Sequence, residues 1–142
     1  MKIKKYWKKI NPEIKYIALL FIATRVVLTI IGVASLGILD PYYGQHNVWH
    51  YSEHKYLDTW GVWDSGWYLG IANNWYSPTL EKGGPTDGQA SYAFFPLYPG
   101  LIKIFKPLFG DFFITSLVIS NIALLIACWF LYKLVKIDYG DK

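Results

Sequence analysis

Two long stretches of the chain are almost free of charged side chains. Residues 16–39 contain a single charge, Arg25, and residues 112–132 contain none. Each stretch exceeds the roughly 20 residues with which an α-helix crosses about 30 Å of hydrocarbon. We therefore predict an all-α membrane protein with transmembrane helices at residues 16–39 and 112–134. A cleaved signal peptide is the alternative for the first stretch, although its apolar run is longer than the usual ~7 to 15 residues.

The lysines are distributed unevenly around these two stretches. Six of the first 15 residues are lysine, and further lysines follow the second stretch. Residues 40–111 instead contain seven acidic residues and four lysines. Because basic residues beside a span favour the cytoplasmic side, we predict a multi-pass protein of the cell membrane with both termini cytoplasmic. The basic tail is then 1–15, the extracytoplasmic loop 40–111 and the cytoplasmic end 135–142.

The predicted loop is too aromatic for a flexible linker. Five of the seven tryptophans lie between residues 40 and 111. Aromatic rings with a polar edge favour the headgroup region of a bilayer, so we expect short helices that lie against the membrane surface. Apolar residues at helical spacing predict one helix over residues 47–76. Leu101 to Phe109 predicts a short amphipathic segment with Lys103 and Lys106 facing water.

Three histidines in this loop, His46, His50 and His54, follow one another at helical spacing. The string from His50 to His54 includes Glu53 and matches the H-x-x-E-H pattern of some zinc enzymes. A catalytic zinc site also needs a third protein ligand and an ordered surrounding shell, which the pattern alone does not supply. We expect a solvated or interfacial helix face instead, with no metal and no other cofactor. The role of the three histidines stays open.

The carboxylate with the most distinctive neighbours is Asp64, which is flanked by Trp63, Gly66 and Trp67. Aromatic neighbours that exclude water raise the basicity of a carboxylate and suit it to general-base chemistry. The alternative is an ordinary carboxylate on a helix surface. Two further acids compete with it: Asp40, which we expect to end the first span, and Asp58, which a continuous helix would place on another face.

A charged residue lies deep in the first predicted span. Arg25 is nine residues from residue 16, or roughly 14 Å along a helix. A guanidinium there costs at least ~2.5 to 3.5 kcal/mol unless it is paired or meets a polar cavity. Asn121 is placed to meet it near the midplane but cannot neutralise its charge. We therefore expect an anionic ligand such as a lipid phosphate, or an acid on helices outside this chain; snorkelling toward the cytoplasmic face is the alternative.

Two strings of residues resemble one known family. They are Trp63-Asp64-Ser65-Gly66-Trp67-Tyr68-Leu69-Gly70-Ile71-Ala72 and Ala93-Phe94-Phe95-Pro96-Leu97-Tyr98-Pro99. In order and in position after a first span, they are similar to the amino-terminal part of the GPI mannosyltransferase 2-like family of GT-C glycosyltransferases. Arg25 and the segment 136–142 also resemble that family. One departure is Trp75, where family members often have glycine.

The resemblance implies an inverting transfer of a sugar, usually mannose, from a polyprenyl-phosphate donor to an extracytoplasmic hydroxyl. Asp64 matches the position of the catalytic carboxylate. Substrate-binding residues implied by the resemblance are Trp63, Trp67, Tyr68, Phe94 and Phe95, with Arg25 as a further phosphate contact. Metal is often unnecessary in this chemistry.

The resemblance covers nearly the whole chain but about the first third of a typical family member. We therefore expect the amino-terminal portion of a GT-C enzyme, inactive without its remaining spans. Its partners would be the donor lipid, the membrane and those spans. Nucleic acid is not expected, because topology and anionic lipid explain the basic run. The rival interpretation is a small non-catalytic membrane subunit or lipid-binding hairpin.

Overall fold

The computed structural model describes residues 11–39, 50–80 and 88–140, and within these ranges the chain is helical without strands. The elements in chain order are α2 (Pro12–Leu39), α3 (Lys55–Asp58), α4 (Ser65–Asn74), the 3-10 helix η1 (Ser91–Ala93), α5 (Leu97–Phe109) and α6 (Phe112–Tyr139). The predicted all-α class is confirmed for the described residues.

The two longest helices, α2 and α6, run antiparallel and are both long and apolar enough to cross a membrane. Each has 28 residues, which corresponds to roughly 40 Å. No residue of α2 is buried within the described chain, so α2 is not the core helix of a compact unit formed by these residues. The helices contain the predicted spans but are longer, because α2 starts at Pro12 and α6 continues to Tyr139.

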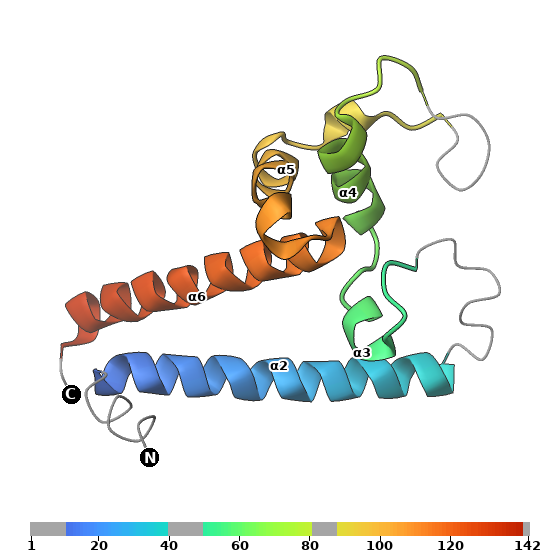
Figure 1. The fold of residues 1–142 in the computed structure, drawn as a ribbon. Helices are drawn as coiled ribbons and strands as arrows, with labels where there is room; N and C mark the ends of the chain where they lie inside the picture. The colour runs from blue at the N-terminus through green and yellow to red at the C-terminus, as the bar shows by residue number, and fades with distance from the viewer. Residues whose placement is uncertain (1–10, 40–49, 81–87, 141–142) are drawn as a thin grey trace.

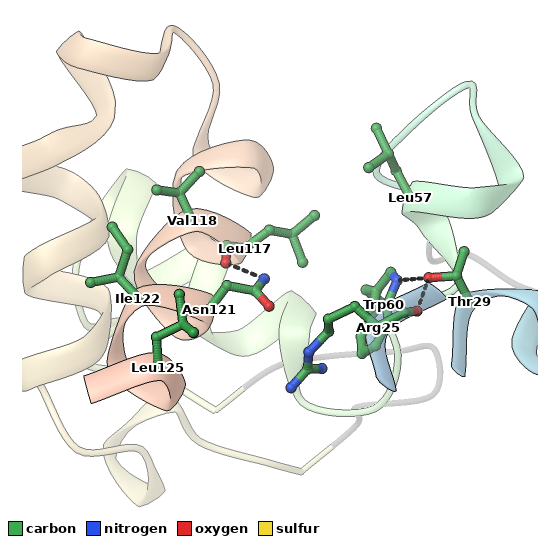
Figure 2. A pocket seen from close by; sticks show the side chains of 9 residues that line it. All are labelled: Arg25, Thr29, Leu57, Trp60, Leu117, Val118, Asn121, Ile122 and Leu125. Atoms are coloured by element: carbon green, nitrogen blue, oxygen red, sulfur yellow. Dashed lines mark hydrogen bonds between the residues drawn. The ribbon is translucent and has the colours of Figure 1, made fainter. Parts of the chain in front are cut away.

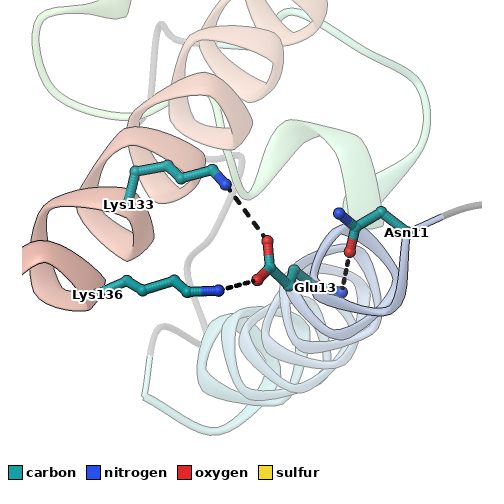
Figure 3. Close-up of polar contacts among 4 residues, drawn as sticks. All are labelled: Asn11, Glu13, Lys133 and Lys136. Carbon is teal, nitrogen blue, oxygen red and sulfur yellow. Dashed lines mark hydrogen bonds and ion pairs between the residues drawn. The ribbon is translucent and has the colours of Figure 1, made fainter. Parts of the chain in front are cut away.

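The two long helices are joined by ion pairs near the chain ends. Glu13 of α2 accepts hydrogen bonds from Lys133 at 3.4 Å and from Lys136 at 2.8 Å (Figure 3). In Figure 1 the helices approach each other at this end and separate toward the other, where α3 lies against α2. The space between them therefore widens away from the termini.

Polar caps explain where the long helices begin. The backbone N–H of Glu13 donates to Asn11 Oδ1 at 2.8 Å, and Pro12 takes the first helical position, where no backbone donor is needed. Asp111 Oδ1 accepts from the N–H of Ile114 at 2.9 Å at the start of α6. Just before it, Gly110 has φ 78°, a left-handed conformation that ends α5 and lets the chain turn directly into α6.

The prediction of one helix over 47–76 is wrong for the described part of that range. Residues 50–54 and 59–64 are not helical, and only the short helix α3 and the helix α4 form. Trp63 has φ 56°, which an α-helix cannot accommodate. The apolar spacing that suggested a single helix therefore joins residues of two separate elements.

The largest concentration of buried side chains lies where α4 and α5 meet the start of α6. Ile71 and Ala72 of α4, Ile102 of α5 and Phe113 of α6 are all nearly or fully buried. α5 contains the predicted amphipathic segment but starts four residues earlier, at Leu97. Lys103 is exposed as expected. Lys106, by contrast, is half-buried, and its ammonium lies 5.5 Å from the centre of the Phe112 ring.

The turn after α3 packs closely against α2. A Cβ atom on Gly32 would come within contact distance of the Thr59 side chain, so only glycine permits this approach. The indole of Trp60 reaches α2 one turn earlier and donates from Nε1 to Thr29 Oγ1 at 3.2 Å. The connecting segment is thereby attached to the side of α2 rather than only to its end.

Candidate functional site

A buried carboxylate organises the segment before α4. Asp58, the last residue of α3, is 3% exposed. Its Oδ1 accepts from the backbone N–H of Tyr51 at 2.8 Å, and its Oδ2 lies 2.8 Å from His50 Nδ1. These contacts connect Asp58 to two residues that precede it by seven and eight positions. Asp58 is therefore committed to holding the fold and is not presented to solvent.

Tyr51 lies between this carboxylate and α6. Its ring packs on Phe113 with the centroids 5.4 Å apart, and its hydroxyl is buried without a hydrogen-bond partner. Burial, together with the nearby charge of Asp58, raises the pKa of Tyr51 to about 12. The phenol therefore stays protonated at neutral pH and cannot act as a base.

The histidines do not share a helical face in the described residues. His50 lies outside any helix and contacts Asp58, whereas His54 precedes α3 and stacks on Tyr56 with ring centroids 5.2 Å apart. His46 lies outside the described residues. Within those residues no group of three side chains could hold a metal ion. The predicted helix face is therefore wrong for His50 and His54, although both side chains are exposed to solvent, and His50 also contacts Asp58.

Asp64 is placed very differently from Asp58. It is exposed, immediately precedes α4 and does not cap that helix with its side chain. The prediction that neighbouring aromatic residues exclude water from it does not hold in this structure. Trp63 has a left-handed backbone conformation and is 89% exposed, so it contributes no wall beside the carboxylate. Asp64 is therefore an accessible carboxylate whose side chain is not engaged in helix capping.

Three of the predicted aromatic residues form a cluster, and two of them lie on α4 within four residues of Asp64. Trp67 stacks on Phe94 at 5.4 Å between ring centroids, and the edge of Tyr68 meets the same phenylalanine at 5.2 Å. Phe95, in contrast, is 76% exposed and does not join them. The structure thus brings together Trp67, Tyr68 and Phe94 from the two sequence strings, and leaves Trp63 and Phe95 outside.

One residue that the sequence analysis did not single out completes this cluster. Tyr98 of α5 meets Tyr68 edge to face with centroids 5.1 Å apart. Its hydroxyl donates to Ser116 O at 3.0 Å and lies 2.7 Å from Ser120 Oγ on α6. Tyr98 therefore connects the aromatic cluster to α6. Its position in the second string was the available signal.

Arg25 occupies a separate site, between the long helices. Its guanidinium carbon lies 4.9 Å from the centre of the Trp60 ring and 5.2 Å from that of Phe21. Its Nε is buried without a hydrogen-bond partner, and no ion pair to Arg25 occurs among the described residues. Two aromatic faces are thus its principal contacts in this part of the chain.

Arg25 and Asn121 line the same cavity, as their positions in the two predicted spans suggested. The cavity measures about 370 Å³ and lies between α2, α3 and α6. Figure 2 shows Arg25 extending from α2 toward Asn121 of α6, with Trp60 beside it. Apart from these residues and Thr29, the lining is aliphatic and comes from α3 and α6.

Comparisons of the chain with protein-family models, with curated proteins and with solved structures find no match.

Proposed function

We propose that this chain is the amino-terminal portion of a membrane glycosyltransferase. It would move a sugar, mannose in the first instance, from a polyprenyl-phosphate donor to an acceptor hydroxyl outside the cytoplasm. The observation that carries the proposal is the contrast between two neighbouring acids. Asp58 is buried and already bonded, whereas Asp64 is exposed and lies beside a packed aromatic cluster.

In the proposed reaction Asp64 acts as the general base. Its carboxylate takes the proton of the acceptor hydroxyl while the hydroxyl oxygen forms a bond to the anomeric carbon of the sugar. The bond from that carbon to the phosphate oxygen breaks, and its electron pair leaves with the polyprenyl phosphate. The products are a glycoside with inverted configuration and a polyprenyl phosphate, and no metal or redox step is required.

The aromatic cluster suits a sugar or lipid substrate. Trp67 and Tyr68 lie on α4, three and four residues after Asp64, and Phe94 packs against both rings. Aromatic rings offer flat apolar faces together with polar edges. The exposed rings of Trp63 and Phe95 are free to contact a substrate or a further part of the enzyme.

We further propose that the remaining spans of the enzyme are needed for turnover. The outward faces of both long helices carry exposed apolar side chains, among them Leu20 and Ile31 of α2 and Phe130 of α6. In a bilayer these faces meet lipid or other helices. Asp64 is exposed, and a transfer site must exclude water from the activated sugar. Additional helices would supply that enclosure.

The lysine asymmetry supports an orientation with both termini in the cytoplasm. The test replaces Cys128 by alanine and introduces single cysteines at two exposed positions, Gln89 and Asp138. A membrane-impermeant thiol reagent on intact cells is expected to label the cysteine at position 89 and not the one at 138. Labelling of position 138 alone would reverse the orientation.

The function itself is tested with a panel of donors. Membranes that contain a full-length protein with this segment receive labelled mannose on polyprenyl phosphate, on polyprenyl diphosphate or on a nucleotide. Transfer is expected from the monophosphate lipid only. Transfer from the nucleotide alone would contradict the proposal. No transfer from any donor by a folded, membrane-inserted protein would favour the non-catalytic subunit instead.

A further inference from the structure

The cavity between α2, α3 and α6 combines one cation with apolar walls. Arg25 is the charged residue of the lining, and five of the nine lining residues are aliphatic. The polar neighbours of Arg25 in the lining already have hydrogen-bond partners of their own. Trp60 Nε1 donates to Thr29 Oγ1 at 3.2 Å, and Asn121 Nδ2 donates to Leu117 O at 2.7 Å. None of these contacts supplies a negative charge to the guanidinium of Arg25.

The contacts of α2 also define the surroundings of Arg25. The non-helical segment 59–64 follows α3 and touches α2 at Gly32 and Thr29. Such backbone does not face lipid hydrocarbon, because its polar groups would lack partners there. This side of α2 is therefore covered by protein at Thr29. Arg25 is four residues away, or roughly 6 Å, and faces the cavity on the same side of the helix.

A group attracted to this site must be anionic and must carry an apolar chain. A guanidinium matches a phosphate with two parallel hydrogen bonds, whereas aliphatic walls give a free inorganic anion nothing to bury. We propose that the cavity binds the phosphate of a membrane lipid, with Arg25 as its main contact and the first carbons of the lipid chain against Leu117 and Leu125. The inference deepens the proposed function and rests on it only for the identity of the lipid.

Binding can be measured without turnover. Purified full-length protein in a non-ionic detergent is mixed with a polyprenyl phosphate, and retained lipid is counted by native mass spectrometry. Arg25→Gln is expected to raise the dissociation constant at least tenfold, and Arg25→Lys less, because it keeps the charge. Lys103→Gln, which removes an exposed cation on α5, serves as the matched control and is expected to bind normally.

A second variant addresses the risk that Arg25→Gln fails to fold. Leu125→Trp keeps the arginine but fills part of the cavity, so it is expected to weaken polyprenyl-phosphate binding at least tenfold while the protein stays folded. Normal binding by folded Arg25→Gln, or by folded Leu125→Trp if the arginine variant does not fold, would overturn the inference.

Three other probes define what the site recognises. The uncharged polyprenol is expected not to bind, and millimolar inorganic phosphate is expected not to displace the lipid. Displacement by inorganic phosphate would overturn the assignment to lipid. If phosphatidylglycerol bound as tightly as polyprenyl phosphate, the cavity would be a general site for lipid phosphates. The result would then no longer support the sugar donor as its specific ligand. Normal lipid binding without sugar transfer would contradict the proposed function and leave this inference standing.

Discussion

Replacing Asp64 by asparagine is expected to lower sugar transfer by about 10² to 10⁴-fold in a full-length protein that contains this segment. Asparagine keeps the size and hydrogen-bonding reach of the side chain but cannot take the proton of the acceptor hydroxyl. Because Asp64 is exposed and does not cap α4, its replacement should leave folding and donor binding unchanged. Initial rates with saturating labelled donor provide the measurement.

Asp138→Asn is the matched control for this substitution. Asp138 is an exposed acid near the end of α6, at the opposite end of that helix from the aromatic cluster. The Asp138→Asn protein is expected to transfer sugar at the normal rate. Near-normal transfer by Asp64→Asn would remove Asp64 as the base.

Replacing Asp58 by alanine is expected to destabilise the protein by about 2 to 4 kcal/mol. The substitution removes the acceptor for the backbone N–H of Tyr51 and the partner of His50. Hydrogen bonds to a charged group contribute about 1.5 to 3 kcal/mol each, and a buried donor left without a partner adds to the loss. His50 is 42% exposed, so water recovers part of its contribution. Unfolding by denaturant in detergent, followed by tryptophan fluorescence, measures the change.

Two further variants make this prediction specific. Asp58→Asn retains an oxygen for the Tyr51 N–H, so it should lose less stability than the alanine variant. Glu53→Ala removes an exposed acid in the same segment and should be neutral within about 0.5 kcal/mol. If Asp58→Ala were as stable as the Glu53 variant, the carboxylate would not hold the segment together.

The long helices were predictable because a charge-free apolar run leaves few alternatives. The class of fold and the approximate limits of α2 and α6 follow from such runs. The additional turns of α2 and α6 could not be predicted from such runs. They contain the charged residues Glu13 and Lys136, which form an ion pair between the two helices. Hydropathy alone therefore started the first predicted span after the beginning of α2 and ended the second before the end of α6.

The connecting segment was less predictable, because its shape depends on contacts between distant residues. The spacing of Trp60, Trp63 and Trp67 fits a helix, but Trp60 instead packs on α2 and Trp63 breaks the helix with a positive φ. The pairing of Asp58 with His50 likewise depends on a turn that no local pattern indicates. Placing Asp58 on another face of a continuous helix was therefore wrong, and its importance for folding was missed.

The candidate site was predicted in part for a related reason. Trp67, Tyr68 and Phe94 meet because α4 packs against α5. The two sequence strings did not indicate this packing by themselves, and only the family resemblance placed these residues at one site. The exposure of Trp63 and Phe95 could not be foreseen, because flanking residues in a string can face opposite directions. That Arg25 and Asn121 line the same cavity was foreseeable from their positions in two antiparallel spans.

The most direct test of the central claim, a single displacement from a polyprenyl-phosphate sugar with Asp64 as base, is the anomeric configuration of the product. The transferred mannose is examined by NMR, and the released lipid is quantified in the same reaction. One base without a covalent intermediate predicts a sugar of inverted configuration and one polyprenyl phosphate released for each sugar transferred. A product with retained configuration would contradict the account, because retention requires a second displacement on the enzyme.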